Sequence, residues 1–315
     1  MEYGRLGNSG LVVSKIGLGT NNFGGRIDLD QTRAVLHRAL DHGITLLDTA
    51  DSYGGGKSEE FIGQVLGPRR HDVVIATKFA SAMGESPYTR GTSRRYLMQA
   101  VEASLRRLTT DHIDLYQIHW PDAQTPILET LQALDDLVRQ GKVRYIGECN
   151  FAGWQMVDLA WTARVEHLAR PISAQHEYSL LRRQVQAELL PAARAMGMGF
   201  LPYFPLASGF LTGKYRRGQA PPPGARLSNM PADRASRFLN ARNFDLLERC
   251  EAFASERGHS MTELAFAWLL AQPEISSVIA GATRPEQVDQ NVAAAAWKLT
   301  PDELAAVPGP GEGGA

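Results

Sequence analysis

Short apolar runs alternate with longer amphipathic stretches along most of the chain. The runs are rich in branched aliphatic residues, which is typical of strands buried on both faces of a parallel sheet. Eight such units, each followed by a helix, favour closure into an α/β fold of the (β/α)8 TIM barrel type over an open doubly wound sheet. The eight β-type runs lie at residues 15–19, 44–48, 73–78, 113–119, 143–148, 171–175, 199–203 and 276–279.

Two of the amphipathic stretches show the helical period clearly. One carries aliphatic residues every three or four positions, at Leu97, Val101, Leu105 and Leu108. The other carries apolar residues at similar spacing, at Trp154, Val157, Trp161 and Val165. Both stripes predict helix faces packed against the barrel, and the two tryptophans are interpreted as packing residues.

The connections and the chain ends complete the predicted architecture, a single domain over residues 1–315. Residues 3–13 flank an Asn- and Gly-bearing turn, which predicts a small β-hairpin before the barrel. Long aperiodic βα loops at residues 79–92 and 204–237 are of a kind that is functional or mobile. The Gly- and Pro-rich residues 309–315 predict a disordered tail.

Composition narrows the class of protein. The chain is 43% hydrophobic and 21% charged with a net charge of −1, which disfavours nucleic acid and anionic membranes as partners. Its start lacks the apolar core of a signal peptide, and no apolar run approaches the ~20 residues of a membrane span. Two cysteines, Cys149 and Cys250, make no disulfide framework. We therefore expect a cytoplasmic protein that acts on a small molecule; nothing in the sequence sets its oligomeric state.

Several motifs of known chemistry are incomplete or absent. Gly17-Leu18-Gly19 begins like a dinucleotide fingerprint, but Asn22 occupies the place of the third glycine. Gly56-Lys57-Ser58 ends like a phosphate-binding P-loop, but Asp51 stands where the first glycine is required. The histidines lack metal-ligand spacing, and no serine lies in a G-x-S-x-G turn. A Rossmann domain, a P-loop, a metal site and a serine hydrolase are therefore not expected.

Four ionisable side chains lie at or just after the ends of three predicted strands. Asp48 ends one strand and Tyr53 follows it, while Lys78 and His119 end two others. The carboxyl ends of barrel strands meet at one face, where barrel active sites are assembled, so we expect these side chains to converge. An ammonium beside a phenol lowers its pKa from ~10, and a carboxylate holds the ammonium in place. Such a tyrosine can exchange a proton with a carbonyl or alcohol oxygen, while a histidine orients that oxygen.

Reduction of a carbonyl also requires hydride, which no side chain provides. A nicotinamide cofactor is the expected source. Each of the four residues alone has an ordinary structural explanation, such as a cap, a surface charge or a packed ring. It is their shared placement at strand ends that favours catalysis.

The same residues resemble the signature of the aldo-keto reductases. The resemblance is carried by residues 47–54 (LDTADSYG), 77–78 (TK) and 117–119 (QIH), and it extends over residues 17–291. It implies a (β/α)8 barrel that binds extended NADPH without a Rossmann fold. By this resemblance Tyr53 is the general acid or base, Lys78 and Asp48 tune it, and His119 orients the carbonyl.

The resemblance also implies a set of cofactor-binding residues. On the nicotinamide half they are Gly19, Thr20, Asn21, Asn150, Gln175 and Tyr203, the last as the aromatic that stacks on the ring. In the loop that would cover the pyrophosphate they are Leu206, Gly209, Leu211 and Lys214. At the adenosine end they are Gly281, Thr283, Arg284, Gln287, Gln290 and Asn291.

The adenosine end also has a physical basis in the sequence. Thr283 and Glu286 form a capping-box pattern, which predicts a helix that begins at Thr283 and can receive a phosphate. The guanidinium of Arg284 suits a 2′-phosphate. We therefore expect NADPH, or NADP+, to be preferred over NADH.

The chain departs from the family pattern at a few positions. Cys149 replaces the usual serine before Asn150, which puts one hydrogen bond to the carboxamide in question, and Ala280 replaces the usual proline. His119 argues against the relatives that reduce activated C=C bonds with a glutamate at that position. The expected walls of the substrate pocket are Phe23, Phe79, Tyr88, Trp120 and Phe210.

The expected function is reduction of aldehydes or ketones to alcohols by an NADPH-dependent oxidoreductase. One alternative is an NADP(H)-binding redox-sensing subunit with little turnover, like the potassium-channel β subunits. Another is a sugar or polyol dehydrogenase that works in the oxidative direction. The sequence names neither the substrate, the direction nor the stereochemistry.

Overall fold

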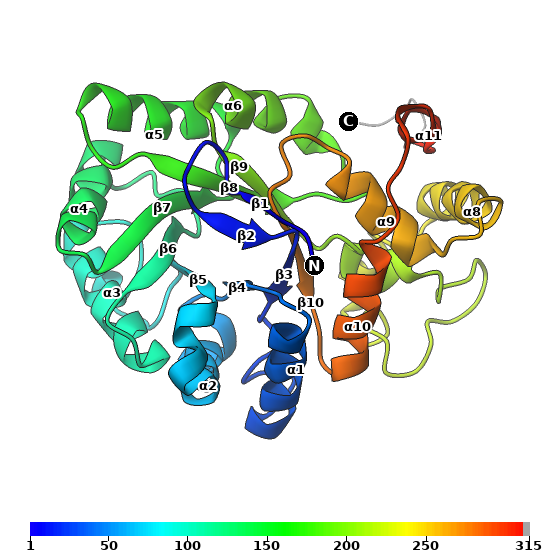
Figure 1. Ribbon diagram of the computed structural model, residues 1–315, viewed down its shortest axis with the longest axis horizontal. Coiled ribbons are helices and arrows are strands. Elements are labelled where there is room, and N and C mark those ends of the chain that lie inside the picture. The colour runs from blue at the N-terminus through cyan, green and yellow to red at the C-terminus, as the bar shows by residue number, and fades with distance from the viewer. Residues whose placement is uncertain (311–315) are drawn as a thin grey trace.

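The computed structural model describes residues 1–310 and confirms the predicted barrel (Figure 1). Eight parallel strands lie in the order β10-β3-β4-β5-β6-β7-β8-β9, and each begins and ends within two residues of its predicted bounds. An isolated bridge from Phe200 in β9 to Ile275, three residues before β10, brings the sheet close to closure. The barrel strands are β3 (Ile16–Gly19), β4 (Leu46–Asp48), β5 (Val74–Phe79), β6 (Ile113–Ile118), β7 (Val143–Cys149), β8 (Pro171–Glu177), β9 (Gly199–Tyr203) and β10 (Val278–Gly281).

Helices follow the strands and cover the outside of the barrel (Figure 1). Their apolar faces and the outward side chains of the strands form the larger hydrophobic core. Two short helices and one longer one, α7, α11 and α8, lie outside the strict alternation with strands. The helices are α1 (Leu29–Asp41), α2 (Lys57–Leu66), α3 (Arg94–Leu108), α4 (Ile127–Arg139), α5 (Gly153–Val165), α6 (Leu189–Met196), α7 (Ala232–Ala235), α8 (Ala241–Ser255), α9 (Met261–Leu270), α10 (Pro285–Ala294) and α11 (Pro301–Ala306).

The predicted hairpin is present and closes one end of the barrel. β1 (Tyr3–Arg5) pairs antiparallel with β2 (Val12–Ser14), and in Figure 1 the pair crosses in front of the barrel strands. Leu6 and Val13 are fully buried in a small core with inward-facing strand residues. Gly7 has φ +57°, and a Cβ there would lie 2.5 Å from the Gly199 nitrogen, so only glycine fits this approach. The site must therefore lie at the opposite, carboxyl end of the strands.

The prediction for the aromatic stripe on α5 is wrong. Trp154 and Trp161 are 66% and 54% exposed, and the face that packs on the barrel carries Met156, Leu159 and Ala163 instead. The helix is apolar on both faces, so spacing alone could not tell which of them turns inward.

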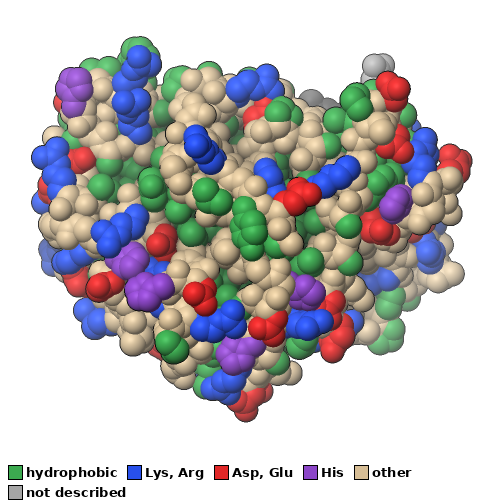
Figure 2. Space-filling view, in the orientation of Figure 1, with side chains coloured by type: hydrophobic (Ala, Val, Ile, Leu, Met, Phe, Trp, Pro, Cys, Tyr) green, Lys and Arg blue, Asp and Glu red, His purple; other side chains and the backbone are tan. Residues whose placement is uncertain are grey.

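The surface and the C-terminus carry few special features. Charged side chains of both signs are interspersed on the hairpin side of the molecule (Figure 2). Among residues 1–310, no helix combines the length and apolar character that a bilayer crossing requires. Gly309, at the start of the predicted tail, accepts a hydrogen bond from Arg249 Nη2 at 2.6 Å, and residues 311–315 lie outside the described part of the chain.

Candidate active site

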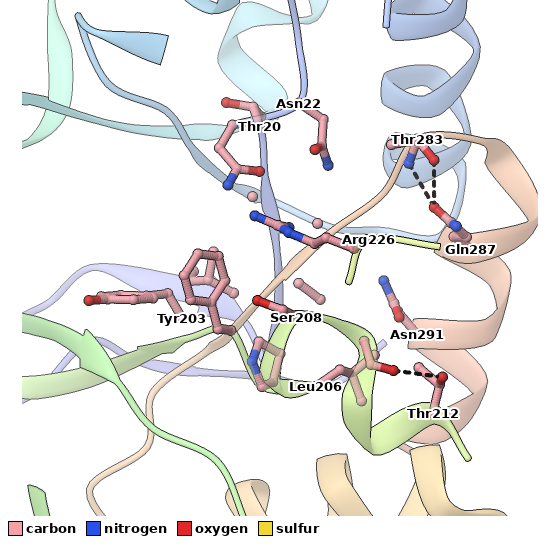
Figure 3. Close-up of a pocket in the computed structure, with 18 of the residues that line it drawn as sticks. Thr20, Asn22, Tyr203, Leu206, Ser208, Thr212, Arg226, Thr283, Gln287 and Asn291 are labelled. Carbon is pink, nitrogen blue, oxygen red and sulfur yellow. Dashed lines mark hydrogen bonds between the residues drawn. The ribbon is translucent and has the colours of Figure 1, made fainter. Parts of the chain in front are cut away.

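A cavity of about 1180 Å³ opens at the carboxyl ends of the barrel strands. It runs from Asp48 and Lys78 at one end to the start of α10 at the other, and loop residues 204–226 form much of one wall. In Figure 3, Thr20 and Asn22 lie on one side of it, Tyr203 and Ser208 on another, and Arg226 reaches between them. The volume lies slightly above the range of ~300–1,000 Å³ usual for small-molecule pockets, which suits an extended ligand.

A buried ion pair stands at the floor of this cavity. Lys78 Nζ lies 2.6 Å from Asp48 Oδ1 and donates to the Thr49 carbonyl at 2.7 Å. The two charged side chains are 1% and 4% exposed. Burial acts to lower the pKa of Lys78, but attraction to Asp48 outweighs it and raises that pKa above its ordinary value. Gln175 Nε2 donates to the same Asp48 oxygen at 2.9 Å, so the carboxylate is held from two sides.

Tyr53 reaches the ion pair from a turn that glycine makes possible. The 3-10 turn η1 (Tyr53–Gly56) places three glycines at φ +60°, +68° and +97°, a region that L side chains rarely adopt. Lys78 Nζ lies 5.2 Å from the centroid of the tyrosine ring. Burial raises the pKa of Tyr53 to about 12, against the opposing effect of Lys78. The expected lowering of this pKa is therefore wrong for the protein alone, because Asp48 offsets the lysine charge and the phenol is desolvated.

His119 completes the group as a neutral ring. Its imidazole meets the Tyr53 ring edge-on, with centroids 5.9 Å apart, and stacks on Trp120 at 5.6 Å. Burial, and then the charge of Lys78, lower the pKa of His119 to about 3. A neutral imidazole can donate a hydrogen bond from one nitrogen and accept one at the other.

Amide side chains on the next strands join the same network. Asn150 has φ +63°, donates to the His119 carbonyl at 3.1 Å and accepts from the Tyr203 hydroxyl at 2.8 Å. Asn150 Nδ2 also lies 3.1 Å from Cys149 Sγ, so the sulfur occupies a hydrogen-bonding position beside the amide. Burial raises the pKa of Cys149 well above its ordinary value, so this thiol stays neutral.

Cations gather further along the cavity, away from Lys78 and Tyr53. Burial and the charges of Arg284 and Arg26 lower the pKa of Lys214, and burial and Arg26 lower the pKa of Arg226. Within residues 1–310, Arg26, Lys214 and Arg226 make no ion pair with a carboxylate. Such mutually repelling charges are relieved by a bound anion, so the donor set fits the phosphates of a dinucleotide.

The predicted capping box at the far end is wrong. α10 begins at Pro285, with Arg284 in extended conformation as its N-cap and no side-chain cap. The Thr283 amide and hydroxyl instead donate to Gln287 Oε1 at 2.7 and 3.1 Å (Figure 3). Glu286 Oε2 lies 3.7 Å from Arg284 Nε, so the two side chains form an ion pair. Proline favours the first helical position, which moves the start of the helix past the threonine.

Most of the predicted site residues line the cavity. The four ionisable residues and every predicted cofactor residue except Leu211, which is buried in the core, are on its wall. Of the predicted substrate walls only Trp120 is there. Three of the others, Phe23, Phe79 and Phe210, are fully buried in the core. Tyr88 lies on the turn η3 (Pro87–Thr89), away from the cavity wall. It is 56% exposed, and its ring contacts the guanidinium of Arg95.

Sequence reasoning missed several residues of the wall. Arg26 and Arg226 have no periodic or motif context, and only the position of Arg226 in the long aperiodic loop pointed toward the site. Phe204 and Pro205 also lie on the wall. The other missed residues on the wall include Asn22, Ser208, Thr212, Pro222, Pro223, Gly224, Ala225, Ser260, Thr262 and Glu263.

The chain is similar to known proteins along nearly its whole length. Residues 15–309 match the Aldo/keto reductase family. The uncharacterized oxidoreductase YrpG of Bacillus subtilis (strain 168) is 39% identical, over 99% of this chain and 97% of the relative. A probable voltage-gated potassium channel subunit beta of Oryza sativa subsp. japonica is 36% identical, over 93% and 91%. L-glyceraldehyde 3-phosphate reductase of Escherichia coli (strain K12) is 35% identical, over 93% and 87%.

Proposed function

The chain belongs to the aldo/keto reductase family, and on that premise we propose that it is an NADPH-dependent reductase of aldehydes or ketones. The observation that carries the proposal is one continuous cavity. It joins a buried Lys78–Asp48 pair with Tyr53 and His119 at one end to Lys214 and Arg226 further along, two cations that have no carboxylate partner among residues 1–310. Proton-transfer groups and an anion-binding surface are the two things that a nicotinamide-dependent carbonyl reduction requires of the protein.

Different residues on the cavity wall suit different parts of a bound dinucleotide. When bound, NADPH supplies the hydride. Asn150 and Gln175 offer amides for the carboxamide, and Tyr203 offers an aromatic face for the ring. Arg226 and Lys214 suit the pyrophosphate, and the exposed guanidinium of Arg284 suits a 2′-phosphate.

Proton transfer falls to Tyr53 in this proposal. Its high pKa keeps the phenol protonated at neutral pH, so it can donate to the oxygen of a carbonyl as negative charge develops there. Lys78 stabilises the phenolate that remains, and Asp48 holds the ammonium in place. His119, neutral above about pH 4, can donate a hydrogen bond to the same oxygen and so orient it.

A second function is favoured by the similarity to the potassium channel β subunits. The same cavity would then bind NADP(H) as a signal, with little turnover. The two functions share every cofactor-binding residue. They differ only in the rate of turnover at Asp48, Tyr53, Lys78 and His119, the catalytic tetrad of the proposal.

Turnover separates the two. The experiment follows loss of the reduced-nicotinamide absorbance with NADPH and a panel of aldehydes, ketones, sugar phosphates and dicarbonyls, with NADH in parallel and alcohols with NADP+ in reverse. Turnover of a panel carbonyl with NADPH supports the reductase. Tight NADPH binding with negligible turnover in both directions would replace it with the binding function.

A further inference from the structure

The loop after β5 places a serine against the catalytic histidine. Ser81 Oγ lies 3.1 Å from His119 Nδ1, one of the two ring nitrogens. Among the described residues, no second hydrogen-bond partner is found for this hydroxyl.

The backbone of the loop is held so that this contact can form. Ala80 has φ +92°, a strained conformation that residues with a side chain rarely adopt. The Gly91 amide donates to the Ala80 carbonyl at 3.1 Å. The Tyr96 hydroxyl, on α3, lies 3.3 Å from the Ser81 carbonyl and 3.5 Å from Asp51 Oδ2. A strained residue fixed on both sides turns the Ser81 hydroxyl back toward the barrel.

A neutral imidazole exists in two tautomers, and the bond at one nitrogen selects which of them forms. A substrate carbonyl oxygen can only accept, so the nitrogen that faces it must carry the hydrogen. A serine hydroxyl can donate to the other nitrogen. Only the tautomer with hydrogen on Nε2 and a lone pair on Nδ1 satisfies both partners.

We propose that Ser81 is a positioning residue that donates its hydroxyl hydrogen to His119 Nδ1 and thereby keeps Nε2–H directed at the substrate carbonyl. The inference rests on the proposed function for its catalytic consequence, but not for the hydrogen bond itself. Since the pKa of His119 is lowered to about 3, the ring is neutral at working pH and its tautomer is the variable that matters.

The direct test is the nitrogen NMR spectrum of His119 in the ¹⁵N-labelled protein, assigned by its loss in His119→Asn. We expect Nδ1 to resonate as an unprotonated, hydrogen-bonded acceptor in the unaltered protein, and to move toward a free acceptor or a tautomer average in Ser81→Ala. Ser81→Thr keeps a hydroxyl and should restore the original position. A protonated Nδ1 in the unaltered protein would overturn the proposal, and so would an unmoved resonance in Ser81→Ala.

Kinetics supply the second readout. Ser81→Ala should lower kcat for carbonyl reduction about 3- to 10-fold, the weight of one neutral hydrogen bond, with NADPH affinity unchanged. Ser81→Thr should recover most of the loss. Ser86→Ala is the matched control, because Ser86 lies on the same loop, is exposed, and bonds only within its own turn. Equal kcat values in all three variants would contradict a positioning role.

The two readouts separate this inference from the proposed function. If no carbonyl is reduced yet the Nδ1 resonance moves in Ser81→Ala, the hydrogen bond stands and the reductase function fails. If carbonyls are reduced and neither readout changes in Ser81→Ala, the reductase function stands and the role of Ser81 is wrong.

Discussion

The two ends of the cavity hold their charges in opposite ways. At the tetrad end, Lys78 and Asp48 are almost fully buried and lie 2.6 Å apart, with Gln175 and the Thr49 carbonyl as further partners. Toward the other end, Lys214 and Arg226 face the cavity near other cations and without a carboxylate partner among residues 1–310.

Under the proposed function, the difference separates a surface that performs the chemistry from one that binds the cofactor. Charges that are paired by the protein are fixed before any ligand arrives, which suits transition-state stabilisation. Charges that repel one another are relieved only when an anion binds, so part of the binding energy comes from that relief. The comparison yields four predictions, each of which alters one end and leaves the other as a reference.

The largest effect is expected from Tyr53→Phe. The variant loses only the proposed proton donor, so kcat for carbonyl reduction should fall about 10²- to 10⁴-fold with NADPH affinity nearly unchanged. Steady-state kinetics and a fluorescence titration with NADPH measure the two quantities. Tyr3→Phe, on the hairpin at the opposite end of the barrel, is the matched control. Retained turnover in Tyr53→Phe would remove the assigned role of the phenol.

The second largest effect concerns the free energy of unfolding, which should respond differently to substitutions at the two ends of the cavity. Lys78→Met leaves the buried Asp48 carboxylate without its cation, so the free energy of unfolding should fall by about 3–5 kcal/mol. Arg226→Ala breaks no ion pair within residues 1–310, and in the absence of ligand its effect should stay below about 1 kcal/mol. Urea denaturation measures both. Similar losses in the two variants would show that the ends do not differ as described.

The affinities for NADPH and NADH should distinguish the roles of Arg226 and Arg284. Arg226→Ala should weaken NADPH and NADH alike by about 10-fold, because both carry the pyrophosphate. Arg284→Ala should weaken NADPH much more than NADH, because only NADPH has a 2′-phosphate.

Arg217→Ala is the control for these two variants. Arg217 lies on the same loop as Arg226 but pairs with Asp245 and Glu248 on the outer surface, so its loss should leave both affinities unchanged. Isothermal titration with each nucleotide provides the measurement. Equal losses for NADPH and NADH in Arg284→Ala would contradict the 2′-phosphate assignment.

The smallest effect concerns Asp51, a buried carboxyl behind the paired end. Burial, and then the charge of Glu59, raise the pKa of Asp51 from 3.8 to about 7. The folded state therefore holds a proton that the unfolded state has lost, and stability falls as pH rises from about 4 to about 7. Asp51→Asn removes this dependence and should gain about 1 kcal/mol or more over the unaltered protein at pH 8. Thermal unfolding at pH 5 and pH 8 measures it; an equal difference at both pH values would contradict the raised pKa.

The strands and the tetrad were predictable because both follow local rules. Buried parallel strands are short apolar runs whatever surrounds them, and the barrel brings their carboxyl ends together. Asp48, Lys78 and His119 could therefore be placed at one face before any contact was known. The two overturned helix predictions, at Thr283 and on α5, also concern local rules, but in each a competing signal was present: Pro285 in one and apolar residues on both faces in the other.

By itself, the sequence determined the order of strands and helices, the residues at the strand ends and the chemistry that those residues can perform. Which aromatic side chains enter the cavity was decided only by the tertiary structure, since Phe23, Phe79 and Phe210 turn into the core while Phe204 reaches the wall. The electrostatic environment of the site was also decided only by the tertiary structure. The pKa of Tyr53 rises rather than falls because the fold desolvates the phenol. The pKa of Arg226 is lowered by burial and by Arg26, a residue far from it in the chain. Desolvation and repulsion both depend on distances that only the tertiary structure sets.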